Sequence, residues 1–130
     1  MILAVGIDSV EVNRFKNWKN YNKRQLLRIF SQEEINYSFA NKANYMQRLA
    51  ARFAAKEAFF KAFSTAFPLL KTPFLTLAKH CSITKKSNIP SIKVNWKEIS
   101  KKNPLLNIKI FVSLTHTRLT ATAIIILEKL

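Results

Sequence analysis

The sequence of 130 residues holds a single cysteine, Cys81, and a single glycine, Gly6. One cysteine cannot form an intrachain disulfide or a cysteine-rich zinc module, so we expect a reducing, cytoplasmic setting. One glycine cannot build the glycine-rich phosphate loop of a Walker or Rossmann site, which excludes those classes. No apolar run approaches the ~20 residues that cross a membrane, and the apolar start at residues 1–7 is too short for the core of a signal peptide.

Acidic residues are also few: seven Asp and Glu stand against twenty-two Lys and Arg, and Asp8 is the only aspartate. The formal net charge is +15 and the isoelectric point is about 10.3. A chain this basic favours an anionic partner, which could be a nucleic acid, a membrane surface, a phosphorylated ligand or an acidic protein. Abundant lysine, isoleucine and asparagine are also typical of an AT-rich genome, so we expect part of the charge to be compositional drift.

The length indicates a single domain over 1–130, long enough to bury a core without disulfides, and no repeat or linker divides it. Five short apolar stretches predict strands at residues 2–7, 82–84, 91–94, 108–114 and 120–127. The last two are expected to pair as an antiparallel hairpin. Mixed with the helices described next, these strands predict an α+β fold.

The strongest predicted helix covers residues 46–63, where large apolar side chains recur every three to four residues and alanines fill the neighbouring positions. Ser31 and Glu34 have the spacing of a capping box, which predicts a helix continuing through residue 39. We also expect short surface helices within 14–28, a loop at 69–77, and a short helix over 96–101 closed by residues 103–104.

Asp8 ends the first predicted strand and shares its face with Gly6. Because glycine has no side chain, we expect open space beside the carboxylate, where a hard cation could bind. Asp8 could equally be a turn residue or the cap of a helix over residues 10–16, and taken alone it favours that structural role.

Glu57 and Lys61 lie four residues apart on the predicted long helix, which usually makes an ordinary surface ion pair. Their face also carries Ala50 and Ala54, so a ligand or a second chain could approach the helix closely. Lys56 falls within the apolar stripe, where its ammonium group must extend to solvent or find a partner.

Four other residues carry no clear functional signal when taken alone. Arg48 and Arg52 lie one turn apart on another face of the long helix, where charges are usually solvated. His116 ends a predicted strand, and a lone histidine there is usually structural or exposed. Cys81 has no set of partners for nucleophilic catalysis, so we expect it to be inert.

Several segments match one family in order and separation. Residues 6–14 read GIDSVEVNR, residues 52–62 read RFAAKEAFFKA, and residues 112–117 read VSLTHT. The segment IFSQEE at 29–34 lies between the first two. They resemble the GID-x-VE-x-x-R opening, the RFAAKEAF-x-KA helix, the VSISHT hairpin and the IL/F-T/S-x-x-E segment of holo-acyl-carrier-protein synthases. The resemblance covers nearly the whole chain, and its helix motif is highly specific.

This resemblance implies a 4′-phosphopantetheinyl transferase fold, with one long central helix packed on a small antiparallel sheet. It implies transfer of 4′-phosphopantetheine from coenzyme A to a serine of apo-acyl carrier protein, with release of adenosine 3′,5′-bisphosphate. It also implies Mg²⁺ as the cofactor, a cytoplasmic homotrimer with active sites between subunits, and no nucleic-acid partner.

The resemblance also assigns residues. Asp8 and Glu57 would be the metal ligands and, with Lys61, the catalytic residues. Lys61 would neutralise the phosphates or protonate the leaving group, and the serine proton could pass to a metal-bound water or, through water, to Glu57. His116 and Thr117 would come from the neighbouring subunit. The residues implied to contact coenzyme A are Arg52, Lys61, Ser64, Asn88, Pro90, His116, Thr117 and Lys42.

Arg14, Arg24 and Arg28 match basic positions with which the family docks its acidic carrier protein. Nearby lysines either extend that patch or form a solvated basic face; they are Lys16, Lys19 and Lys23. The chain departs from the family in regions that touch the coenzyme. Glycines after the long helix are replaced, the Gly-Lys-Pro turn is reduced to residues 88–90, and an expected basic pair is thinned to Lys42.

The alternative function is a small basic RNA-binding protein, which the composition alone would favour. Its phenylalanines could then be stacking platforms for bases. However, they recur at helical spacing, which fits a buried core better, and RNA binding gives no purpose to the Gly6/Asp8 pair or to the Glu57/Lys61 pair.

Overall fold

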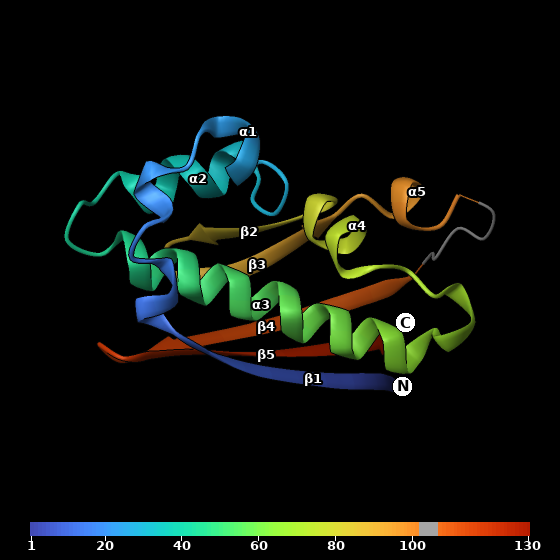
Figure 1. Cartoon of the computed structure of the whole chain (residues 1–130). Helices are drawn as coiled ribbons and strands as arrows, with labels where there is room; N and C mark the ends of the chain where they lie inside the picture. Colours follow the sequence, from blue (N-terminus) through green and yellow to red (C-terminus); the bar gives the residue numbers. More distant parts are fainter. Residues whose placement is uncertain (102–106) are drawn as a thin grey trace.

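The computed structural model describes residues 1–101 and 107–130, and it places one long helix, α3 (Tyr45–Ala66), between two small sheets (Figure 1). The larger sheet is antiparallel in the order β1-β5-β4, and the smaller is the β2–β3 pair. The strands are β1 (Ile2–Glu11), β2 (Cys81–Lys86), β3 (Ile89–Val94), β4 (Ile108–His116) and β5 (Thr120–Lys129). This confirms the predicted α+β fold, the predicted hairpin (β4–β5) and the long central helix.

Shorter helices cover the side of α3 that faces away from the larger sheet. They are α1 (Lys23–Leu26), α2 (Gln32–Phe39), α4 (Phe74–Lys79) and α5 (Trp96–Ile99). The chain also forms 3₁₀ turns at Val12–Phe15, Trp18–Asn20 and Pro68–Leu70. The predicted capping box is present at the start of α2, where Ser31 and Glu34 exchange hydrogen bonds between side chain and backbone. The predicted end of the last short helix at residues 103–104 lies outside the described residues.

Gly6 allows α3 to lie directly on β1. A Cβ atom at this position would overlap the carbonyl oxygen of Ala58 and lie 3.0 Å from the backbone nitrogen of Ala62. The prediction of open space beside Asp8 is therefore wrong, because the backbone of α3 fills the space next to Gly6. Asp8 also lies within β1, opposite Ala123, rather than at a strand end or a helix cap.

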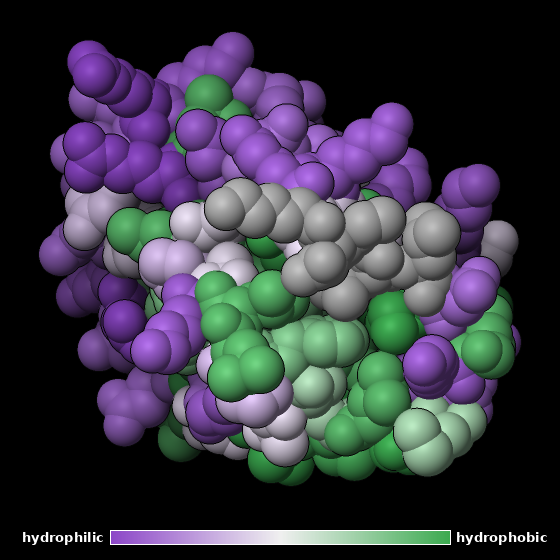
Figure 2. All heavy atoms as spheres, turned by 90° about the vertical axis from the view of Figure 1, so that its right-hand side faces the viewer, coloured by the Kyte–Doolittle hydropathy of each residue, from purple (hydrophilic) through white to green (hydrophobic). Residues whose placement is uncertain are grey.

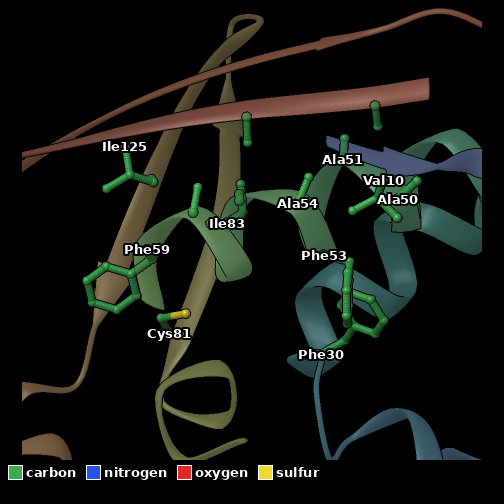
Figure 3. Close-up of a cluster of buried hydrophobic side chains, with 14 of the residues drawn as sticks. Val10, Phe30, Ala50, Ala51, Phe53, Ala54, Phe59, Cys81, Ile83 and Ile125 are labelled. Carbon is green, nitrogen blue, oxygen red and sulfur yellow. The ribbon is translucent and has the colours of Figure 1, made fainter. Parts of the chain in front are cut away.

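The alanines of α3 form a thin contact surface with the sheet. Figure 3 shows Ala51 and Ala54 on the side of α3 that faces the larger sheet, with Phe53 and Phe30 on the other side. Ala50 and Ala54 are fully buried, so the expectation that this face is open to a ligand is wrong. Their small size lets the sheet, not a ligand, approach the helix.

The prediction of a loop at residues 69–77 is also wrong, because α4 begins within this range, at Phe74. Pro73 takes the N-cap position with φ −66°, which suits the start of a helix. Phe74 then packs edge-on against Phe53 and Phe60, with ring centroids 5.7 and 5.8 Å apart. Tertiary packing therefore stabilises a helix of only six residues.

The surface divides by polarity along the same layers. Figure 2 shows hydrophilic side chains over the upper part of the face, on the side of α1 and α2, and hydrophobic ones gathered below, on the side of the larger sheet. Within the described residues, no helix combines the length and apolar character that spanning a bilayer requires.

Candidate active site

A carboxylate from β1 and an ammonium group from α3 meet at the edge of the larger sheet. Nζ of Lys61 lies 2.8 Å from Oδ1 of Asp8 and donates a 3.0 Å hydrogen bond to the carbonyl oxygen of Ile7. Asp8 is largely shielded, with 18% of its side chain exposed, whereas Lys61 is 52% exposed. Among the described residues, the ion-pair partner of Lys61 is therefore Asp8 on β1, and not Glu57 one turn earlier on α3.

Glu57 lies near enough to this pair to interact with both charges. Partial burial raises the pKa of Glu57, and the negative charge of Asp8 raises it further, whereas Arg14 and Lys61 lower it. The guanidinium of Arg14 lies 4.7 Å from the ring centroid of Phe53, one helical turn before Glu57. We call Asp8, Glu57 and Lys61 the edge site.

The edge site has the donor set of a magnesium site. Mg²⁺ in proteins is usually bound by one or two carboxylates, with waters and substrate phosphates completing its coordination. Asp8 and Glu57 supply two carboxylates, and a divalent cation would relieve the repulsion that raises the pKa of Glu57. No group of three or more His, Cys, Asp or Glu side chains is placed to hold a metal within residues 1–101 and 107–130. With two carboxylates as ligands, most coordination positions of such a cation would be left to waters and to phosphate oxygens of a ligand.

A second group of predicted residues lines a cavity of about 510 Å³ formed by α3, the β2–β3 hairpin and the end of β4. This group consists of Arg52, Asn88, Pro90 and His116. Arg52 and Glu57 are five residues apart on α3, which places them about 140° apart around the helix axis. We call this cavity the cavity site; within one chain it lies on another side of α3 from the edge site.

The cavity site is strongly cationic. Arg48, Arg52, Lys85 and His116 line it, and the described lining residues include no acid. The guanidiniums of Arg48 and Arg52 lie 4.2 and 4.1 Å from the ring centroid of Tyr37. Arg52 is only 3% exposed, burial lowers its pKa, and its Nε has no hydrogen-bond partner in the described structure. A buried guanidinium with an unused donor favours an anionic ligand.

Three other predicted residues lie outside the cavity lining of the described chain. Ser64 is exposed on α3, one turn after Lys61 and on the same side of the helix. The Thr117 hydroxyl accepts a 3.1 Å hydrogen bond from the backbone N–H of Thr120, so it closes the β4–β5 turn. Lys42 is exposed in the segment before α3. Their contacts with coenzyme A stay predictions.

Among the residues that the sequence did not assign to the cavity site, three are charged or aromatic: Tyr37, Arg48 and Lys85. The signal for Arg48 was present, because a residue four positions before Arg52 shares its helix face. Tyr37 and Lys85 come from α2 and β2, and no local pattern shows that these elements meet α3.

Lys56 finds a buried partner. Its Nζ lies 2.7 Å from Oε1 of Glu34, and both side chains are fully buried. The ammonium also donates to the carbonyl oxygens of Ile29, Ala78 and Cys81 at 2.7, 2.8 and 2.9 Å. Lys56, which precedes Glu57 in the chain, therefore connects α3 to three other segments. These are the chain after α1, the end of α4 and the start of β2.

The arginines expected to dock a carrier protein are all exposed. Arg14 follows β1, Arg24 lies in α1, and Arg28 follows α1. Arg14 also lowers the pKa of Glu57, so the basic surface begins beside the edge site.

Comparison with known proteins agrees with this architecture. The family profile of the 4′-phosphopantetheinyl transferase superfamily matches residues 4–115. A holo-[acyl-carrier-protein] synthase of Treponema denticola is 35% identical over 128 residues, covering 98% of this chain and 99% of the relative. The synthase of Treponema pallidum strain Nichols is 41% identical over 128 residues, covering 98% and 97%.

Solved structures show the same fold. A holo-[acyl-carrier-protein] synthase from Neisseria meningitidis superposes with a TM-score of 0.75 at 26% identity, covering 99% of this chain and 100% of that chain. One from Bacillus anthracis, in complex with coenzyme A (3′,5′-ADP), gives a TM-score of 0.76 at 24% identity, covering 99% and 98%. At that identity the second likeness speaks for the fold alone.

Together, the fold and the full-length relatives define a phosphopantetheinyl transferase enzyme. The chain belongs to the 4′-phosphopantetheinyl transferase superfamily, as a member of its holo-[acyl-carrier-protein] synthases. The resemblance found in the motifs is thereby confirmed.

Proposed function

We propose that this enzyme transfers 4′-phosphopantetheine from coenzyme A to a serine of an apo-acyl carrier protein, with Mg²⁺ as cofactor. The products are holo-acyl carrier protein and adenosine 3′,5′-bisphosphate. The names of the relatives support the carrier as substrate, and the similar structure with bound coenzyme A supports the donor. The observation that carries the proposal is the ion pair of Asp8 with Lys61 at one edge of the sheet, where Glu57 lies near enough to interact with both charges.

In this reaction the serine Oγ forms a bond to the phosphorus that carries pantetheine. The bond from that phosphorus to the bridging oxygen breaks, and adenosine 3′,5′-bisphosphate leaves with the oxygen. Lys61 offsets the charge that develops on the leaving group or donates a proton to it. Glu57 takes the serine proton through a water molecule hydrogen-bonded to its carboxylate.

Asp8 and Glu57 would hold the cation, which when bound supplies positive charge to the pyrophosphate oxygens. Asp8 would then exchange its ion pair with Lys61 for the metal. The half-exposed Lys61 side chain would become available to a phosphate oxygen of the substrate. Asp8 and Glu57 would thus hold the cation, and Lys61 would orient the pyrophosphate.

We infer that the nucleotide end of coenzyme A binds the cavity site of a neighbouring subunit. The cavity site offers Arg48, Arg52 and His116 to phosphate, and Asn88 and Pro90 line it. Because the edge site lies on another side of α3, a ligand that reaches both within one chain would have to pass around the helix. Two subunits placed side by side remove that difficulty.

The outer face of the larger sheet supports such an assembly. It exposes Val5, Ile7 and Phe111 at 53%, 58% and 42%. A sheet face with this much exposed apolar surface favours contact with further copies of the chain, and the proposed oligomer is a homotrimer. We expect the enzyme to act in the cytoplasm, where the lone thiol of Cys81 would stay reduced.

One experiment tests the proposed function. The purified protein is incubated with coenzyme A, MgCl₂ and apo-acyl carrier protein, and the carrier is weighed by mass spectrometry. A gain of one phosphopantetheine group, absent with EDTA or with a carrier lacking the serine, is the expected result. A carrier of unchanged mass after long incubation would contradict the proposal. Light scattering on the same sample checks the homotrimer.

A further inference from the structure

A wide groove runs between α1 and α4, on the upper side of the molecule in Figure 1. Its volume is about 1060 Å³. Its described lining residues include four Lys and Arg side chains and no acid: Lys23, Arg24, Leu27, Arg28, Leu75, Thr76, Lys79 and His80. The groove therefore combines exposed positive charge from both helices with apolar side chains from both.

We propose that α4 forms the second wall of the surface that docks the carrier protein. This inference rests on the proposed function, and it assigns Lys79 and Leu75 a role in binding an acidic amphipathic helix of the carrier. The sequence predicted contacts with the carrier only at basic positions around α1. Because residues 69–77 were predicted to be a loop, the sequence did not indicate that α4 borders the same groove.

Charge complementarity identifies the occupant. An acidic helix, about 10–12 Å across, could set its carboxylates against the cations of both walls. Leu75 is 56% exposed and Leu27 is half-buried, so an apolar stripe of the same helix would find partners between the charges. A flat basic surface would offer the charges alone.

Aromatic packing links the α4 wall of the groove to the part of α3 that carries Glu57. Phe74 precedes Leu75 and packs against Phe53 and Phe60, which flank Glu57 on α3. Phe53 in turn lies under the guanidinium of Arg14. A carrier helix seated between α1 and α4 would thus lie beside the side of α3 that presents Glu57.

The two walls are fixed relative to the catalytic helix. Lys56 of α3 donates to the carbonyl oxygen of Ile29, directly after the α1 wall, and to that of Ala78, within the α4 wall. Because the Lys56 side chain is fully buried and Lys56 precedes Glu57 in the chain, the groove and the edge site share one rigid support. A docked carrier would therefore present its serine at a defined distance from Glu57.

The test measures binding apart from transfer. Fluorescently labelled apo-carrier is titrated with wild-type enzyme, with Lys79→Glu, and with the matched charge reversal Lys97→Glu. Lys97 is exposed on α5 and lines neither the groove nor the cavity site. We expect Lys79→Glu to weaken carrier binding about threefold or more, more strongly at low salt, and Lys97→Glu to have less than half that effect. The KM for coenzyme A should not change.

A charge-swap experiment then separates contact from a general loss of positive charge. Each acid of the carrier helix is reversed to lysine in turn, and one reversal should restore the affinity of Lys79→Glu. Equal affinities of wild type and Lys79→Glu for the carrier would overturn the inference. A Lys79→Glu variant that loses affinity only for a homopolymer RNA would overturn it as well. Transfer to the carrier by wild type, followed by mass, reports separately on the proposed function.

Discussion

Lys61 of α3 and Asp8 of β1 form an ion pair at 2.8 Å, although 53 positions separate them in the chain. The pair depends on the contact between α3 and Gly6, which brings the helix against the strand. It orients the Asp8 carboxylate beside Glu57 before any ligand binds. The edge site is thus preorganised by the same packing that builds the fold.

Removing either carboxylate should abolish transfer. One carboxylate holds Mg²⁺ poorly against water, so Asp8→Ala and Glu57→Ala should each lower kcat/KM about a thousandfold or more, which corresponds to about 4 kcal/mol. Transfer is measured by carrier mass at low millimolar Mg²⁺. Glu11→Ala, an exposed carboxylate on the same strand, is the control and should stay active with an unchanged melting temperature. Full activity of Asp8→Ala or Glu57→Ala would refute the metal assignment.

Gly6→Ala should destabilise the fold. The added methyl group would overlap the Ala58 carbonyl, so strand and helix must separate at a cost of about 1–3 kcal/mol. Urea unfolding followed by circular dichroism gives the free energy of unfolding. Glu11→Ala again serves as the control on β1. A Gly6→Ala protein as stable as wild type would show that α3 can shift without cost.

The sequence predicted the elements whose signal is local. The spacing in α3, the capping box at Ser31 and the hairpin each depend on residues close in the chain, and all three are present. The helix α4 was missed because Pro73 and a short apolar stretch look like a loop unless the rings of Phe53 and Phe60 are in place.

The residues of the candidate site also divide into those with a local sequence signal and those that depend on the three-dimensional structure. Glu57 and Lys61 were recognisable as a pair at helical spacing, and the family motif added Asp8. The separation between the edge site and Arg52 requires the three-dimensional path of α3. The partner of Lys56 was also out of reach, because Glu34 lies on another helix and only packing brings the two together.

The buried pair of Lys56 and Glu34 should respond non-additively to mutation. Lys56→Met leaves the Glu34 carboxylate buried without its cation, which should cost about 3–5 kcal/mol of unfolding free energy. Adding Glu34→Gln to that variant should recover part of the loss, because a neutral amide can still accept the hydrogen bond from the backbone of Ile83. The measurement is a double-mutant cycle in urea.

A surface pair provides the comparison for this cycle. Lys101 lies 3.8 Å from Glu98, and both side chains are exposed. Lys101→Met should therefore change the free energy of unfolding by less than about 0.5 kcal/mol. A buried pair that behaved like this surface pair would contradict the role given to Lys56.

Cys81 should make stability depend on alkaline pH. Burial raises the pKa of its thiol to about 12 in the folded protein, whereas an unfolded thiol ionises near about 8.5. The folded state then holds the proton more tightly, so this contribution is complete below about pH 8.5 and is lost as pH rises toward 12. Unfolding free energies of wild type and Cys81→Ala are compared from pH 7 to 10. Above about pH 8.5, the unfolding free energy of wild type should fall relative to that of Cys81→Ala. A difference between the two proteins that stays constant with pH would contradict the raised pKa of the thiol.

The proposed sharing of a site between subunits makes the last prediction. Glu57→Ala removes the edge site, and His116→Ala removes part of the cavity site, so each variant alone should transfer little or nothing. If the two sites of one chain served the same ligand, mixing the variants would leave every subunit defective. If the edge site of one subunit works with the cavity site of the next, mixed assemblies contain some junctions with both parts intact. Unfolding and refolding the two variants together should therefore recover a fraction of wild-type activity, rising with the share of mixed oligomers measured by native mass spectrometry. Verified mixed oligomers without recovered transfer would show that each chain carries a complete site of its own.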